Sequence, residues 1–291
     1  MSYEEYIKKL DELKLKAERA IIQNLPDLER DAEAFLVRYL DEHFDTKAGN
    51  LLANEVAAQG LGNFTDIYLQ TLTELESYQG TVGQYLKNFK SIGDLMTEFQ
   101  ADNGVDVKQA RLGAVQEVVV GEIVNQYSEN GLNKGFVQPL REILFKNVSG
   151  GLNKRRAIEQ LHDYIASGKD TTGKLGQYLT QTAQQGVDSY SGAINTRILQ
   201  TFKIDTLLMS GSLIKTSSPQ CRYGIEKLGG IIDRSDWPRI EKIAKENGLI
   251  EGTTFDTLPV NKFHWGCRHE FTAMVLDASQ RKNLLSNPVN N

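Results

Sequence analysis

The stretch YSGAINTRILQTFKIDTLLMSGSLIK, residues 190–215, contains the change of pattern that decides the fold. Its first half completes a long helical pattern that begins near residue 173 and ends at Phe202. Its second half contains two short apolar runs, residues 204–209 and 212–215, which are typical of strands. The sequence therefore predicts a helical part that is followed by a smaller part with strands.

The residues before this change read as a succession of amphipathic helices, because apolar side chains recur every three or four positions. The first helix carries Leu10, Leu13, Ala17 and Ile21 on one face. The second carries a stripe made by Leu28, Ala32, Phe35, Leu36, Tyr39 and Leu40. Further helices are expected near residues 46–59, 64–78, 82–99 and 107–127, between Gly131 and Gly151, and from Ile158 to Gly168. We therefore expect residues 1–195 to be overwhelmingly helical, with strands only after residue 200.

The helix expected at 107–127 has a strong apolar pattern. We expect its core-facing side to consist of Val115, Val118, Val119 and Ile123.

Helix signals continue after the predicted strands. Pro219 is placed to open a short helix that carries Cys221. Ser235 is expected to cap a further helix, which ends before Gly248. Residues 270–276 are expected to form a closing strand.

The predicted fold class is mainly α with a small α+β C-terminal module, in which short strands and helices surround a Cys/His cluster. Residues 1–198 are the expected helical region for docking or assembly. The α+β module covers residues 199–277, and a polar, loosely held tail covers residues 278–291.

The composition excludes some classes of protein. With 40% hydrophobic and 24% charged residues, the chain resembles an ordinary globular protein. No apolar run approaches the roughly 18 residues of a membrane-spanning helix, and the first residues lack the pattern of a signal peptide. Residues 1–106 hold 20 Asp and Glu against 10 Lys and Arg, which argues against a protein that wraps nucleic acid with its whole surface. Two cysteines in 291 residues suggest a reducing compartment.

Both cysteines and two of the four histidines fall in two compact signatures. The signatures read Ser217-Ser218-Pro219-Gln220-Cys221-Arg222 and Phe263-His264-Trp265-Gly266-Cys267-Arg268-His269. Cys221, His264, Cys267 and His269 form a candidate set of four metal ligands, because thiolates and imidazoles together suit tetrahedral zinc. We expect the two sulfurs to lie within about 4 Å of each other. Two other interpretations stay open: thiols that only pack together beside hydrogen-bonded histidines, and a disulfide formed after release from the cytoplasm.

Catalysis is a weaker interpretation of the same residues. Cys267 with His264 or His269 could form a nucleophile and its base, but the sequence supplies no third residue that would orient the base. The chain also lacks a phosphate-binding glycine loop, a His-Glu-x-x-His motif and a Gly-x-Ser-x-Gly motif. We therefore expect no enzymatic activity and no catalytic residue. Arg268 is expected to point away from its two neighbours, onto a carboxylate, a helix C-terminus or solvent.

The order of these features resembles the C-terminal module of the Mu F-like head-morphogenesis family, the minor capsid proteins of tailed bacteriophages. The matched residues are Ser218, Pro219, Cys221, Leu228, Gly229, Pro259, His264, Cys267, Arg268 and His269. The chain departs from the family pattern at Ser217 and Ser218, where Asp and Arg are common. His269 replaces a more usual last cysteine, and Pro259 stands alone where the family has a Pro-Pro pair.

The resemblance implies a structural role in a virion. A minor head protein of this kind associates with the portal protein, the major capsid protein or both during head assembly in the host cytoplasm. It is then present in several copies in the head or the head–tail connector region, with no membrane contact. The candidate ligand set makes structural zinc the one cofactor expected. Two other classes stay open: a metal-dependent enzyme or effector of nuclease or toxin type delivered with the virion, and an internal virion protein that contacts packaged DNA.

Overall fold

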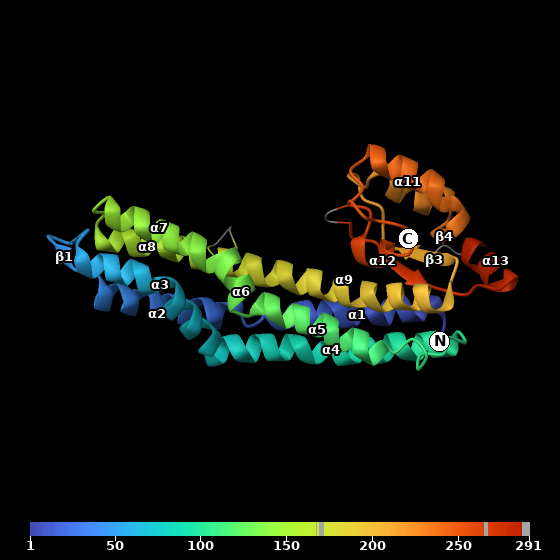
Figure 1. Ribbon diagram of the computed structural model, residues 1–291, viewed down its shortest axis with the longest axis horizontal. Coiled ribbons are helices and arrows are strands. Elements are labelled where there is room, and N and C mark those ends of the chain that lie inside the picture. The colour runs from blue at the N-terminus through green and yellow to red at the C-terminus, as the bar shows by residue number, and fades with distance from the viewer. Residues whose placement is uncertain (167, 169–171, 265–266, 287–291) are drawn as a thin grey trace. The chain divides into compact units, whose positions relative to one another are not determined.

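The computed structural model describes residues 1–166, 168, 172–264 and 267–286 (Figure 1). The predicted fold class, mainly α with a small α+β part, is confirmed. The longer helices are α1 (Tyr3–Ile22), α2 (Leu25–His43), α3 (Glu55–Glu74), α4 (Glu76–Asp102), α5 (Leu112–Tyr127), α7 (Gln138–Ser149), α8 (Lys154–Ile165), α9 (Lys174–Phe202), α11 (Trp237–Glu246) and α13 (Ala278–Ser286). Short helical segments are α6 (Glu129–Leu132), η1 (Asn133–Val137), α10 (Pro219–Arg222), η2 (Tyr223–Lys227), η3 (Arg234–Asp236) and α12 (Leu258–Asn261). None of the helices in these ranges is long and apolar enough to cross a membrane.

The chain forms two compact units that are not continuous in sequence. One, here called the sheet unit, contains residues 1–14, 89–120 and 186–291. The other, here called the helical unit, contains residues 15–88 and 121–185. Helices α1, α4, α5 and α9 therefore each contribute residues to both units. The regions predicted from sequence, with boundaries at residues 198 and 277, stay a prediction.

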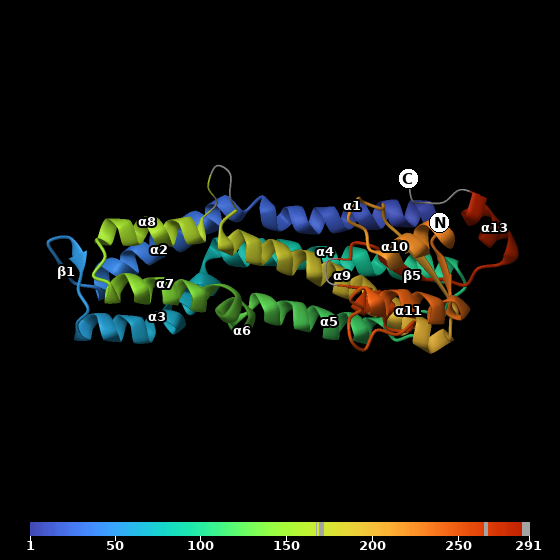
Figure 2. The same cartoon turned by 90° about the horizontal axis from the view of Figure 1, so that it is seen from above.

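The helical unit is built around four helices, α2, α3, α7 and α8 (Figure 2). They contact one another in the order α2, α3, α7, α8 and back to α2. The predicted stripe of α2 faces this core: Leu28, Ala32, Leu36, Tyr39 and Leu40 are buried, and Phe35 is half-buried. The ring of Tyr39 meets the ring of Phe64 edge-on at 5.3 Å, and Phe64 stacks on Tyr68 at 5.1 Å. Aromatic packing therefore fills the centre of this bundle.

A small hairpin precedes α3, so the helix predicted at residues 46–59 is wrong over its first half. Strands β1 (Thr46–Lys47) and β2 (Asn50–Leu51) pair antiparallel. Their turn residues, Ala48 and Gly49, have φ values of 51° and 80°, a left-handed pair that suits a two-residue hairpin and interrupts a helix. Helix α3 begins only after Asn54, whose side chain accepts a backbone hydrogen bond at 2.9 Å. The expectation that strands occur only after residue 200 is also wrong.

The sheet unit contains a three-stranded antiparallel sheet in the order β4, β3, β5, formed by β3 (Thr206–Ser210), β4 (Ile231–Asp233) and β5 (Glu270–Ala273). The strands predicted at residues 204–209 and 270–276 are confirmed in position, and all five residues of the central strand are buried. The strand predicted at residues 212–215 is a loop. The Arg222 guanidinium donates hydrogen bonds to the carbonyls of Ile214 and Lys215 at 2.9 and 3.2 Å, which satisfies them without a partner strand.

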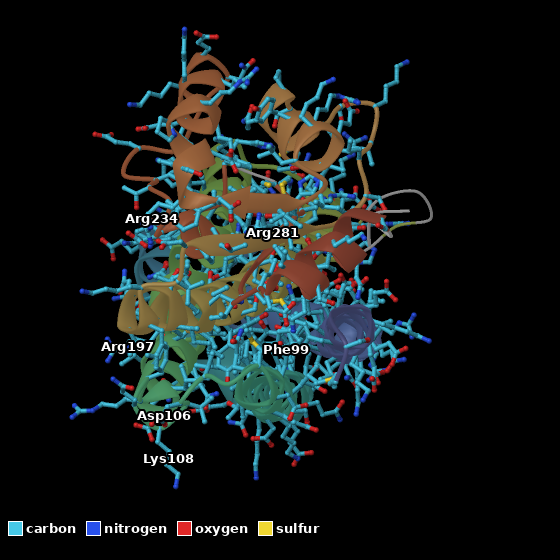
Figure 3. All side chains as sticks on the ribbon, turned by 90° about the vertical axis from the view of Figure 1, so that its right-hand side faces the viewer. Phe99, Asp106, Lys108, Arg197, Arg234 and Arg281 are labelled. Carbon is cyan, nitrogen blue, oxygen red and sulfur yellow. The ribbon has the colours of Figure 1, made fainter. Side chains whose placement is uncertain are left out.

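Two further expectations for this unit are corrected. Asp233 and Asp236 form a capping box around the 3₁₀ turn that leads into α11, so Ser235 is not the cap. The polar tail begins with helix α13 rather than a loose segment. Arg281 of this helix, labelled in Figure 3, donates two hydrogen bonds to the Asp233 carboxylate at 2.6 and 2.8 Å. Helix α13 is therefore held at the end of β4.

Close packing against helices α9 and α4 positions the end of the sheet. Gly192 of α9 allows the segment at Pro259 to lie directly on the helix, because a Cβ at residue 192 would be 2.4 Å from the Pro259 carbonyl oxygen. Asn195, one turn later, accepts a hydrogen bond from the Ala273 amide at 3.1 Å. Gln100 of α4 donates to the Ala273 carbonyl at 3.0 Å. These contacts fix the closing strand and the α12 segment, between which the second signature lies in the sequence.

Candidate metal centre

The two cysteines meet in the interior of the sheet unit. Cys221 lies in α10, which begins at Pro219 and continues into the π-helical turn η2. Cys267 lies just before β5. Their sulfurs are 3.9 Å apart, and the two residues are only 1% and 7% exposed. The predicted contact between the sulfurs is therefore confirmed.

The histidines extend this pair on both sides. The Nδ1 atom of His269 lies 3.7 Å from the Cys267 sulfur, and the Nε2 atom of His264 lies 3.7 Å from the Cys221 sulfur. The ligand atoms of Cys221, Cys267 and His269 all lie within 4.8 Å of one another, and all three residues are buried. His264 is half-buried and lies outside that group of three. The structure thus brings together three of the four predicted ligands and places the fourth beside one of them.

Two distances within this cluster are close to the edges of a metal tetrahedron. Zinc binds thiolate sulfur at about 2.3 Å and imidazole nitrogen at about 2.0 Å. Tetrahedral angles then place two sulfurs about 3.8 Å apart, and a sulfur and a nitrogen about 3.5 Å apart. The observed separations are 3.9 Å and 3.7 Å. The donor set and its spacing therefore fit a soft or borderline divalent ion.

The electrostatics of the two thiols are unequal. Hydrogen bonding from Cys221 lowers the pKa of Cys267, with His269 acting in the same direction against the cost of burial. The same hydrogen bond and burial raise the pKa of Cys221, because its ionisation would place two negative sulfurs side by side. The two thiols therefore do not both ionise readily without a cation. A divalent cation would displace their protons and bind both sulfurs as thiolates.

Lys262 holds the backbone of one cluster residue in place, and this role was not predicted from the sequence. Its ammonium donates a hydrogen bond to the carbonyl of His269 at 2.9 Å, and it lies 3.4 Å from a carboxylate oxygen of Glu270. The backbone of Lys262 has φ 58° and ψ −178°, a conformation that costs free energy in a residue with a side chain. The surrounding contacts therefore hold this lysine, and with it the start of the second signature, in one position.

Glu270 connects the cluster to the first helix. The ammonium of Lys14, on α1, lies 2.7 Å from the same Glu270 carboxylate oxygen and 3.2 Å from the carboxylate of Asp188 on α9. Burial acts to raise the pKa of Glu270, but Lys14 and Lys262 outweigh it and lower that pKa to about 2. Burial likewise opposes the charge of Lys14, but Glu270 and Asp188 raise its pKa. Lys14, Lys262 and Glu270 are called the buried ion network, and the half-exposed Asp188 lies at its edge.

The remaining motif residues lie in the same unit. Gly229 lies in the turn between η2 and β4, and Pro259 lies in α12. Arg268 is exposed between the buried residues Cys267 and His269, so it does point away from its neighbours. Trp265 and Gly266 of the second signature lie outside the described residues.

Comparisons of the chain with models of protein families, with curated proteins and with solved structures gave no match.

Proposed function

We propose that this chain is a structural minor head protein of a tailed bacteriophage, which associates with the portal protein, the major capsid protein or both during head assembly. The observation that carries the proposal is the meeting of Cys221 and Cys267 at 3.9 Å, although they are 46 residues apart in the chain. The resemblance rests on a Ser-x-Pro-x-Cys turn and a His-x-x-Cys-Arg-His ending. A module of that kind requires these two segments to share one centre, as they do here.

The buried position of the cluster favours a structural role over catalysis. Cys221 and Cys267 are almost fully buried, and both histidines contact a cysteine. A catalytic metal needs an open coordination position. Four protein ligands at this centre would close it and would join α10 to the segment that precedes β5.

We propose structural zinc as the ion, held by Cys221, Cys267 and His269 with His264 as the fourth ligand. Zinc has the preference for tetrahedral mixed sulfur and nitrogen ligands that these residues offer. The lysine behind His269 fixes the backbone of one ligand, which is how outer contacts orient metal ligands in general. Elemental analysis of the purified full-length protein tests this part. About one equivalent of zinc retained through gel filtration is expected.

The assembly role is tested on particles. Mass spectrometry of purified procapsids and virions from the phage that encodes this chain should detect the protein in several copies. A pull-down with separately expressed portal and major capsid proteins should then identify which of them binds. Absence from both kinds of particle would reject the head-protein proposal. A chain that instead shifts DNA in a salt-dependent gel assay would favour an internal DNA-contacting protein.

A further inference from the structure

The pair formed by Cys221 and Cys267 has a second chemical capacity besides metal binding. The sulfurs are 3.9 Å apart and nearly excluded from solvent. They are also the chain's only cysteines. Any oxidation that joins two thiols of one molecule must therefore join these two.

Little motion separates the pair from a disulfide. A disulfide brings two sulfurs to about 2.05 Å, so the gap must close by about 2 Å. Rotation about the Cα–Cβ bonds moves sulfurs over such distances, and neither cysteine lies in a β-strand that would restrain it. The contacts that hold the sulfurs now are weak ones, at 3.7 Å to the two histidines. Closure therefore breaks no strong hydrogen bond.

The two cysteines have different access to a small oxidant. Cys267 keeps 7% of its surface exposed and is followed by the exposed Arg268, whereas Cys221 keeps only 1%. Both are too enclosed to meet a cysteine of a second protein molecule. A small neutral hydroperoxide therefore reaches Cys267 first, and the neighbouring Cys221 is the only thiol that can respond.

We infer that Cys221 and Cys267 are a hydroperoxide-sensitive pair, in which Cys267 is oxidised first and Cys221 resolves it to an intramolecular disulfide. The sulfur of Cys267 attacks one oxygen of hydrogen peroxide, the O–O bond breaks, and the departing oxygen leaves as water with the thiol proton. The sulfur of Cys221 then attacks the sulfenic sulfur of Cys267, and the S–O bond breaks. The departing hydroxide takes the Cys221 proton. Two thiols and one peroxide thus give one disulfide and two waters.

Oxidation of the two cysteines would regulate the proposed metal centre, and in this respect the inference rests on the proposed function. The test itself needs no bound metal. A bound ion would occupy both sulfurs and protect them, so metal loading and disulfide formation are mutually exclusive states of one site. The protein would carry the ion in a reducing cytoplasm and the disulfide after exposure to oxidant. Either bond would join the same two segments.

The experiment uses the full-length protein, stripped of metal by a chelator and checked by elemental analysis. After treatment with hydrogen peroxide, a thiol titration under denaturing conditions should fall from two thiols to none. Intact mass should fall by two hydrogen atoms, and a reductant should restore both thiols. The Cys221→Ser variant should instead accumulate a sulfenic acid at Cys267 that a dimedone-type reagent labels. The matched Cys267→Ser variant should stay unlabelled.

Three results would overturn the inference: both thiols survive in the folded wild type under peroxide that oxidises the urea-unfolded protein; the disulfide forms between molecules; or the label appears on Cys221. The first two results are measured on the wild type alone. The test therefore stays decisive even when a variant fails to fold. Zinc content and thiol count are separate measurements. A protein that binds no zinc but forms the disulfide would reject the metal proposal and keep this one.

Discussion

Replacing Lys14 by methionine should destabilise the sheet unit strongly, although this lysine lies on the first helix. Methionine keeps much of the side-chain length and removes the charge. The Lys14 side chain is 13% exposed and that of Glu270 is 10% exposed, so the interaction between them is largely shielded from water. In the variant, Lys262 remains near Glu270 at 3.4 Å, but the shorter contact of 2.7 Å is lost.

Two lines of reasoning give the size of the effect. Removing one partner of a buried ion pair costs about 3–5 kcal/mol, because the other charge stays buried without compensation. The fall of the Glu270 pKa from 4.5 to about 2 corresponds to about 3 kcal/mol of stabilisation of its charged form, shared between Lys14 and Lys262. Since Lys262 remains in the variant, we expect a loss of about 2–3 kcal/mol in the free energy of unfolding.

Urea unfolding followed by tryptophan fluorescence measures this loss, because Trp237 packs on Phe255 and Phe263 inside the sheet unit. The matched control is Lys8→Met, which makes the same substitution at an exposed position of the same helix. The control should stay within about 0.5 kcal/mol of the wild type. A Lys14→Met protein as stable as the control would refute the reasoning, because it would show that the buried ion network contributes nothing to folding.

Four further predictions follow from other contacts. Lowering the pH from about 5 to about 2 should progressively destabilise the sheet unit, because Glu270, whose pKa is lowered in the folded state, stabilises that state only while it is ionised. A fluorescence melt at each pH measures the effect, and a melting temperature that does not change with pH contradicts the prediction. Gly192→Ala should lower the free energy of unfolding by at least about 2 kcal/mol, because its Cβ meets backbone atoms. Gly62→Ala, in open space on α3, should raise the free energy of unfolding by about 0.5–1 kcal/mol, and thermal melts compare the two variants directly. Cys267→Ser should lose about 1–3 kcal/mol with or without metal, but a chelator should lower the melting temperature of the wild type only if the ion is present. Arg281→Ala should weaken the attachment of α13 to Asp233 by about 1 kcal/mol. Amide hydrogen exchange should then become faster in that helix alone.

The sequence predicted the helices well where one face was apolar, as in the α2 stripe from Leu28 to Leu40. It predicted the buried face poorly where apolar residues surround the helix. Helix α5 was expected to bury Val115, Val118, Val119 and Ile123, yet only Ile123 is buried and Val118 is 67% exposed. Consecutive valines give no unique face to a periodicity argument. Three-residue β4 was missed because it is too short to show any alternation.

The candidate site divides in the same way. Scarce cysteines and histidines in short motifs made Cys221 and Cys267 predictable partners across 46 residues. Lys14 and Lys262 carry no such signal, since lysines are common and usually exposed. Their importance arises only when folding places Glu270 between them, and 256 residues separate Glu270 from Lys14. A buried charge pair of this kind is a property of the tertiary structure.

The discontinuous sheet unit sets an order of assembly during synthesis on the ribosome. The helical unit has all its residues once residue 185 has emerged, whereas the sheet unit must wait for β5. During that interval, the buried residues at the start of α1, such as Tyr6 and Leu10, lack the last part of their unit and need protection from aggregation. For the same reason, a fragment of residues 199–277 made alone lacks Lys14, Gln100 and Asn195, which hold its closing strand. The segment that carries the motif is thus the last part of a fold that the first helix begins.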